Sequence, residues 1–411
     1  MAVRLDADRV FDGTRFISEA SVVVEDAQIG FVGPTSELPS QYRHLPANGR
    51  HSTIMPGLWD VHTHFFGVQQ LTMNAMLQTP PAVAGIRVAK DAERMLAAGV
   101  TSVREAGGFG IFLASAVDEG TVLGPTIYAA GAILSPTAGH GDWPSAPLEW
   151  MTSYHRPPQF QLCNGVDECI RAVRMQVRKG ARVIKVCASG GLLGAHDSPH
   201  DQHFSDRELR AIVNEAGLTG KIVMAHATGK AGILAALRAG VHTIEHGSYL
   251  DRECVDAMLE TGAILVPTLA IGHASLRRAE LSPPAVARKL RDAVERAAIG
   301  VNLAYTSGVP IAAGSDFGTS GAGSANPQER GIDEIGYLQE AGLSAVDALR
   351  AATKVAAATV GQTSTATGEL VEGATADLLV LTVDPSSDAS LVANPSAIKE
   401  VWRMGHIVHS S

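Results

Sequence analysis

The pattern of hydrophobic and polar positions changes near residue 54. Before that point, short β-rich pieces such as ASVVVEDAQIGFVG alternate with turn residues and predict a small sheet. From Ile54 onward, short apolar strands alternate with longer stretches in which apolar residues recur at helical spacing, which is typical of βα units with parallel strands. Eight such strands are predicted: IMPGLWDVHTH, VTSVREAGG, TIYAAGAIL, ARVIKVCASGG, KIVMAHA, VHTIEHG, AILVPTL and PIAAGSD.

The number of these units predicts the fold class. Eight βα units favour an α/β fold of the (β/α)8 TIM-barrel type over an open sheet. After Val360, the segments GELVEGATADLLVLTVD and IKEVWRMGHIVHSS return to strand character, and chain termini often lie close together. We therefore expect a barrel over residues 54–360 and a small β-sandwich built from both termini, residues 1–53 and 361–411.

Helices and long loops are also legible. Residues 82–98 carry apolar side chains at helical spacing, and Ser205 with Glu208 forms a capping-box pattern before another helix. Three long connections follow predicted barrel strands, on the face where barrel active sites lie, and predict lids or binding loops: 135–165, 190–204 and 317–331. The aromatic residues of the first predict an apolar pocket wall: Trp143, Trp150 and Tyr154.

Polar side chains stand at or near the ends of several apolar strands. His62 and His64 are two residues apart in a strand, so both point to the same face. A buried polar group without a partner is costly, and a metal centre at the mouth of the barrel gives these placements a common explanation. The complete set is His62, His64, Lys185, His226, His246 and Asp316.

Lys185 is the unusual member of this set. An ammonium in the middle of VIKVCAS would repel cations, and a buried lysine is unfavourable unless its charge is paired or lost. A lysine in a salt bridge is one interpretation. A lysine that has been converted to an anion is the other.

These motifs together resemble the amidohydrolase superfamily, in the subtype in which a carboxylated lysine bridges two divalent metals. The resemblance covers nearly the whole chain, including the GATADL return segment, and points to the imidazolonepropionase-related branch that contains Xaa-Pro dipeptidases. Zinc is the expected metal because nitrogen and oxygen ligands suit it, although cobalt, manganese and nickel also bind such ligands. The resemblance implies one ion on His62, His64 and Asp316, a second on His226 and His246, and carboxylated Lys185 as the bridge.

The resemblance also implies the chemistry, which is hydrolysis of an amide C–N bond by a hydroxide that bridges the two ions. Asp316 would take the proton of the attacking hydroxide and deliver it to the leaving amine. His140, in SPTAGHGD, is the implied substrate contact, and Thr228 stands where related dipeptidases often carry Tyr, which predicts a roomier pocket. Glu245 is expected to point away from the His246 face and to be structural.

The expected substrate is an N-acyl amino acid, an Xaa-Pro-like dipeptide or a bulkier aryl amide. One alternative is a cyclic-amide hydrolase of the imidazolonepropionase type, and another is a non-catalytic barrel that only binds a ligand. A mononuclear deaminase-like site is a further alternative, against which Lys185 argues. The histidines of HDSPHDQH (His196, His200 and His203) match no regular ligand spacing, so we expect a solvated or lid loop there.

Composition narrows the choice of partners. The chain has 411 residues, of which 45% are hydrophobic and 18% charged, and its net charge is −9 without Lys/Arg runs, so nucleic acid and anionic membranes are unexpected partners. The opening MAVRLDADRVFDG lacks the apolar core of a secretory signal, and four cysteines without CxxC spacing predict reduced thiols. We expect a cytoplasmic enzyme with a small-molecule substrate, and a homo-oligomer is compatible with this sequence.

Overall fold

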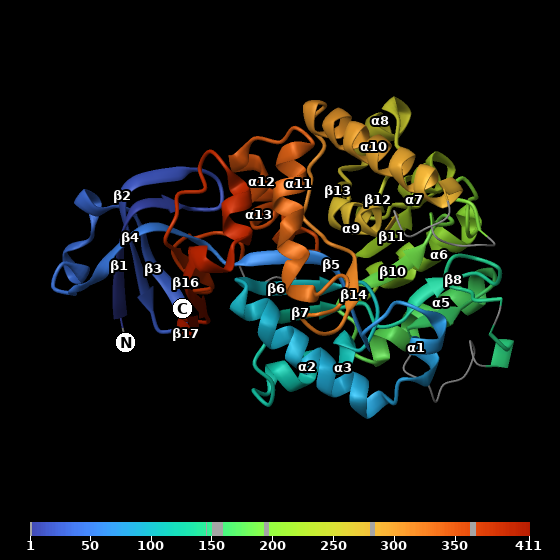
Figure 1. Ribbon diagram of the computed structural model, residues 1–411, viewed down its shortest axis with the longest axis horizontal. Coiled ribbons are helices and arrows are strands. Elements are labelled where there is room, and N and C mark those ends of the chain that lie inside the picture. The colour runs from blue at the N-terminus through green and yellow to red at the C-terminus, as the bar shows by residue number, and fades with distance from the viewer. Residues whose placement is uncertain (1, 145, 150–158, 193–196, 280–283, 362–366) are drawn as a thin grey trace.

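Both ends of the chain contribute to one seven-stranded sheet. The computed structural model describes residues 2–144, 146–149, 159–192, 197–279, 284–361 and 367–411 (Figure 1). The sheet has the order β17-β16-β15-β4-β1-β2-β3. Its central joint is the antiparallel pairing of β15 with β4, in which Leu379 lies opposite Met55. The two terminal segments, which the sequence predicts to come together, thus lie in one sheet. The strands are β1 (Ala2–Phe11), β2 (Phe16–Glu25), β3 (Gln28–Pro34), β4 (Ala47–Pro56), β15 (Leu378–Leu381), β16 (Ile398–Arg403) and β17 (His406–Ser410).

The rest of the strands form two parallel sheets. One has the order β14-β5-β6-β7 and the other the order β13-β12-β11-β10-β8-β9. Sequential strands pair side by side in parallel, as the alternating pattern of strands and helices predicts. The strands are β5 (Leu58–Val68), β6 (Val100–Glu105), β7 (Thr126–Ala129), β8 (Ile133–Ser135), β9 (Phe160–Leu162), β10 (Ile184–Cys187), β11 (Val223–Ala227), β12 (Thr243–His246), β13 (Ile264–Val266) and β14 (Phe317–Thr319).

Backbone hydrogen bonds link the two parallel sheets on both sides. On one side, Arg182 N donates to Ala129 O at 2.8 Å, next to β10 and at the end of β7. On the other side, residues 311–313 lie between β13 and β5, since Ala312 N donates to Leu265 O and Val61 N donates to Ala313 O. The predicted strand PIAAGSD is thus present only as an isolated bridge at Ile311, because few of its backbone groups pair regularly.

Two of the predicted strands are divided. In IMPGLWDVHTH, the chain leaves β4 at Pro56 and enters β5 at Leu58. Gly57 lies between them, where a Cβ atom would meet Thr101 Oγ1 at 2.1 Å, so only glycine lets the chain pass this close. In TIYAAGAIL, Gly131 with a φ of +77° separates β7 from β8.

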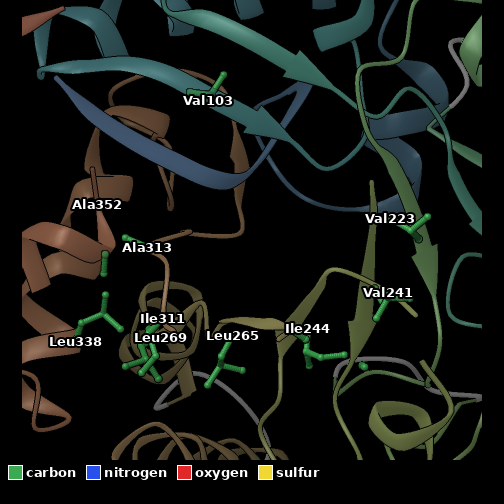
Figure 2. Packing of buried hydrophobic residues seen from close by; sticks show 14 of the residues in the cluster. Val103, Val223, Val241, Ile244, Leu265, Leu269, Ile311, Ala313, Leu338 and Ala352 are labelled. Atoms are coloured by element: carbon green, nitrogen blue, oxygen red, sulfur yellow. The ribbon is translucent and has the colours of Figure 1, made fainter. Parts of the chain in front are cut away.

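Helices surround the parallel strands (Figure 1). The predicted helix at 82–98 is α2, which begins one residue earlier with proline in its first turn, and the capping box of Ser205 and Glu208 starts α6. Helices and strands together bury an extensive apolar cluster, and Figure 2 shows part of it, with Val103, Val223 and Ile244 on strands and Leu269 and Leu338 on helices. The helices are α1 (Met73–Gln78), α2 (Pro81–Ala97), α3 (Gly110–Asp118), α5 (Gly165–Arg178), α6 (Asp206–Gly217), α7 (Lys230–Ala239), α8 (Arg252–Thr261), α9 (Leu269–Ala279), α10 (Pro284–Thr306), α11 (Glu334–Glu340), α12 (Ala345–Ala351) and α13 (Lys354–Ala358).

Two further predictions concern the cysteines and membranes. All four cysteines are buried free thiols, in agreement with the expected reduced state. Within the described residues, none of the helices combines the length and apolar character that a membrane crossing requires.

Candidate active site

The centre of the site is a buried group on β5 and just before β14. His62, His64 and Asp316 each offer a ligand atom, and these atoms all lie within 4.8 Å of one another. The Oδ1 atom of Asp316 lies 3.2 Å from His64 Nε2 and 3.5 Å from His62 Nε2. Asp316 has a φ of +58°, a backbone conformation that residues other than glycine rarely adopt. Such a strained backbone persists only where neighbouring contacts stabilise it.

A buried carboxylate on β5 fixes this strained turn. Asp60 accepts hydrogen bonds from the backbone N–H of Ser315 at 3.0 Å and from its hydroxyl at 2.5 Å. The backbone N–H of Asp316 in turn donates to His62 O at 2.6 Å. These bonds hold the Asp316 carboxylate against the two histidines. Asp60 was not among the predicted site residues. Strand alternation could have pointed to it, because a residue two positions before His62 lies on the same side of the strand.

The other three predicted ligands lie against this group. Lys185 on β10 is 2% exposed, and its Nζ lies 3.3 Å from His62 Nε2. The ring centre of His246 lies 5.1 Å from that of His62 and 4.6 Å from that of His226. The structure therefore brings together all six side chains, which come from five segments of the chain, and all six line one cavity.

The charges of the site suit a divalent cation. Burial lowers the pKa of His62 and of His226 well below 6.5, and it lowers the pKa of His246 to about 4, so these imidazoles are neutral and retain a lone pair. Burial alone would raise the pKa of Asp316, but the neighbouring histidines hold it below its usual range. Neutral imidazoles and an ionised carboxylate are the ligands that zinc and similar ions take in proteins.

Lys185 is not in a salt bridge within the described part of the chain. The only side-chain partner recorded for its Nζ is His62, and no described carboxylate oxygen lies within 4.0 Å of it. Burial lowers the pKa of Lys185. Of the two interpretations given by the sequence, the salt-bridged lysine is therefore wrong for these residues.

Three histidines of this centre, His62, His64 and His246, are held through their Nδ1 atoms. His64 Nδ1 donates to Gly107 O at 2.8 Å, and His246 Nδ1 lies 2.8 Å from Thr268 Oγ1. His62 Nδ1 lies 2.7 Å from Glu245 Oε2. The expectation that Glu245 points away from the site is wrong. His246 has a φ of +71°, which breaks the alternation of side chains at the end of β12. Glu245 and His246 therefore both approach His62, although they are consecutive residues.

His140 and Thr228 both lie at the cavity, as predicted. The ring of His140 stacks on that of His226 with centres 4.3 Å apart and an angle of 13°, and Thr228 Oγ1 lies 3.3 Å from His226 Nε2. His140 Nδ1 donates to Asp197 Oδ2 at 2.7 Å. Burial alone would raise the pKa of Asp197, but the hydrogen bond from His140 lowers it to about 2. The sequence gave no signal for Asp197, because it lies in an irregular loop.

The HDSPHDQH loop is only partly solvated. His203 is buried and its Nδ1 accepts a hydrogen bond from the backbone N–H of His140 at 3.2 Å, so the solvated-loop expectation is wrong for this residue. His200 is exposed and packs against the ring of Tyr249. His196 lies outside the described residues. His242 is exposed and lies just before β12.

The cavity above the centre has a volume of about 560 Å³. Trp143 lines it as predicted, with its ring edge-on to Phe160 at 5.2 Å between centres, whereas Trp150 and Tyr154 lie outside the described residues. Lys185 is the only lysine or arginine among the described lining residues. The remaining wall is mostly apolar, with Phe66, Leu71, Met76, Trp143, Phe160, Ile271, Leu290 and Val294.

Comparison with known proteins gives concordant matches. A family model described as "Amidohydrolase family" matches residues 53–408. Ochratoxinase of Aspergillus niger is 37% identical over 405 residues, which cover 95% of this chain and 83% of that protein, and its crystal structure superposes with a TM-score of 0.92 over the whole chain and 96% of the other. The crystal structure of a prolidase complexed with N-methylphosphonate-L-proline is 32% identical, covers both chains completely and gives a TM-score of 0.89. Imidazolonepropionase of Cupriavidus pinatubonensis is 25% identical over 433 residues, which cover 96% of this chain and 91% of that protein.

Proposed function

Since the chain belongs to the amidohydrolase family and is a hydrolase of amide bonds, we propose that it is a binuclear metal-dependent enzyme for bulky, largely apolar amides. The observation that carries this proposal is the cavity of about 560 Å³, which has six convergent candidate ligand side chains on one side and an apolar wall on the other. A closed (β/α)8 barrel over residues 54–360, with residues 1–53 and 361–411 as a β-sandwich, is the architecture we propose. The hydrogen bonds on both sides of the parallel sheets support it.

The ligands that we propose match the convergent donor set. One ion would be held by His62, His64 and Asp316, the other by His226 and His246, and carboxylated Lys185 would bridge them. The neutral imidazoles, the ionised carboxylate and the lack of a salt bridge between Lys185 and any described acid support this arrangement, and zinc is the proposed metal. When bound, the ions would activate a water molecule and polarise the amide carbonyl.

Residues of this chain would carry the remaining steps. Asp316 lies beside His64 and is oriented by the hydrogen bonds of Ser315 to Asp60, so its carboxylate would take a proton from water and deliver it to the leaving nitrogen. His140 has its Nδ1 occupied by Asp197, which leaves Nε2 for a contact with the substrate. The apolar wall would exclude bulk water and bind the apolar part of the substrate.

The substrate class follows from the wall and from Thr228. An aryl amide or a bulky N-acyl amino acid suits a large apolar cavity better than a small Xaa-Pro-like dipeptide does, and the names of two relatives, ochratoxinase and prolidase, fit linear amide substrates. A cyclic-amide hydrolase is the second candidate, because an imidazolonepropionase matches nearly the whole chain. A cytoplasmic location and a homo-oligomer remain predictions from the sequence.

The test combines a metal count with a substrate screen. Protein purified without chelator is analysed for elements, and the same sample is assayed with aryl amides, N-acyl amino acids, Xaa-Pro dipeptides and a cyclic amide. We expect about two ions per chain and a kcat/KM for aryl amides at least about tenfold above that for the dipeptides, since each apolar contact contributes about 1 kcal/mol or more. The variant Asp316→Asn is the inactive control.

The other results have definite meanings. Turnover of small dipeptides without turnover of aryl amides would refute the proposed substrate class. Ring opening as the main reaction would favour the second candidate. A protein with neither metal nor turnover would be the non-catalytic barrel.

A further inference from the structure

A buried ion pair lies directly behind His62. Glu245 on β12 and Arg104 on β6 are both completely buried, and both carboxylate oxygens of Glu245 lie 2.8 Å from Nη2 of Arg104. Arg104 also donates to the backbone oxygen of Val61 through its Nε at 2.6 Å, one residue before His62. Removing one partner of such a pair leaves an uncompensated charge in the interior, so its position next to a ligand calls for an explanation.

Besides Arg104, each oxygen of Glu245 has one further neighbour. Its Oε1 accepts a hydrogen bond from the hydroxyl of Thr243, and its Oε2 faces the Nδ1 of His62 at 2.7 Å. A carboxylate only accepts hydrogen bonds, so the ring proton of neutral His62 must be on Nδ1. The lone pair of His62 is therefore on Nε2, the atom that lies 3.5 Å from Asp316 Oδ1 and 3.3 Å from Lys185 Nζ.

We propose that Glu245, held by Arg104, is a positioning residue that fixes the tautomer of His62 and thereby its ability to bind a metal ion. The inference rests on the proposed metal centre and adds to it an acid that contacts neither substrate nor metal. Hydrogen bonds from ligating histidines to carboxylates orient the ring and raise the basicity of the ligating nitrogen. Among the contacts that the structure describes, the histidines beside it are tied to a backbone carbonyl (His64) and a hydroxyl (His246), so His62 differs from them in bonding to a charged group.

The substitution Glu245→Gln tests this with a change of one atom. The carboxamide has one oxygen, which we expect at the Oε1 position, where it accepts from both Arg104 and the Thr243 hydroxyl; the bond from Arg104 to the Oε2 position is then lost. Its NH2 group then falls where Oε2 lies now and donates to His62 Nδ1. That moves the ring proton to Nε2, where it occupies the nitrogen that faces the centre.

Glu105→Gln is the matched control. Glu105 adjoins Arg104 on the same strand and is also completely buried, and it accepts a hydrogen bond from the backbone N–H of Gly110 at 3.2 Å. Among the described residues, its carboxylate bonds to backbone N–H groups and to none of the candidate ligand side chains. Because burial raises its pKa to about 8, a neutral carboxamide resembles its form at pH 7.

The experiment uses the full chain, with Co²⁺ alone as the probe. Metal-free protein is titrated with Co²⁺ and followed by visible absorption, and ¹⁵N-histidine labelling reports the ring tautomer of His62 in the metal-free state, assigned by the signal lost in His62→Asn. For Glu245→Gln we expect a Kd for Co²⁺ about 10- to 100-fold weaker and a switch of His62 from the Nδ1–H to the Nε2–H tautomer. For Glu105→Gln we expect a Kd within about threefold of wild type and no change of tautomer.

A second variant covers the case in which Glu245→Gln does not fold. Glu245→Asp keeps the charge against Arg104 but is one methylene shorter, so its contact with His62 lengthens while the ion pair is retained. We expect an intermediate Co²⁺ affinity for it. A wild-type Co²⁺ affinity in Glu245→Gln, or in Glu245→Asp if the first is unfolded, would overturn the proposal, as would an equal loss in Glu105→Gln. If the wild-type protein itself bound no Co²⁺, the proposed metal centre would be wrong. A change of the His62 tautomer from Nδ1–H to Nε2–H in Glu245→Gln would, even then, support the role of Glu245 in positioning His62.

Discussion

Replacing Lys185 by methionine separates its two possible states most sharply. Lys185 is 2% exposed, and no described carboxylate oxygen lies within 4.0 Å of its Nζ. Methionine has a similar length and no charge. If the lysine is carboxylated and bridges two ions, the variant loses the bridge. If it is a plain ammonium, the variant only removes a buried charge.

The magnitude can be estimated for each state of the protein. In the metal-free protein, an unpaired buried charge carries a desolvation cost of several kcal/mol, so an apolar side chain of similar volume is expected to stabilise the fold by at least about 1 kcal/mol. That corresponds to a rise in Tm of about 2 °C. In the wild-type protein with metal at about 1,000 times its Kd, binding adds about 4 kcal/mol of stability, which the variant would lack. The variant is therefore expected to be more stable than wild type without metal and less stable with it.

The assay is a calorimetric scan of both proteins, with chelator and with excess Zn²⁺, combined with elemental analysis and aryl-amide turnover. Lys179→Met at the end of α5 is the control, since Lys179 lies outside the cavity lining and should change neither metal content nor turnover. Two ions per chain and undiminished turnover in Lys185→Met would refute the bridging role. A fall in Tm of the metal-free variant would refute the argument that the lysine charge is unpaired.

Three further predictions follow from the cavity and the buried acids. Trp143→Ala should raise KM for aryl amides about tenfold while leaving KM for small dipeptides within about twofold, because it removes apolar wall that only the larger substrate reaches; equal effects on both would contradict this. Asp197→Asn should lower kcat/KM about 10- to 100-fold at unchanged metal content, because His140 loses the partner that orients it; reduced metal content would instead assign Asp197 to the metal centre. Glu334, whose carboxylate accepts the backbone N–H of Leu269 and of Ala270 at 3.0 and 2.6 Å, has a pKa raised by burial from 4.5 to about 8. Between these two pH values the folded protein keeps this proton while the unfolded chain releases it. The contribution of Glu334 to the free energy of unfolding therefore falls by about 1.4 kcal/mol for each pH unit of increase. Glu334→Gln should flatten that slope in chemical denaturation between pH 5 and 8, and an unchanged slope would show that Glu334 is ionised in the fold.

The six proposed ligands were legible in the sequence because each combines an unusual residue type with a strand end. Two histidines in alternate positions of a strand must share a face, and a lysine inside an apolar strand needs a special environment. Parallel strands point their carboxyl ends to one side, so these residues converge if the units form one barrel. Periodicity likewise predicted α2 and the start of α6, because amphipathic spacing and capping are local properties.

The sequence by itself determined the repeated βα units, the strand character of the two terminal segments and the identity of the convergent side chains. All of these depend on residue type and on short-range spacing. The tertiary structure alone decided the partners of those side chains: Asp60 under Ser315, Asp197 beside His140, and Arg104 with Glu245 behind His62. Glu245 and His62 are 183 residues apart, and the backbone of His246 departs from strand geometry. Contacts between distant segments and a single positive φ both lie outside any local periodicity, which is why the supporting contacts of the site could be found only once the chain was folded.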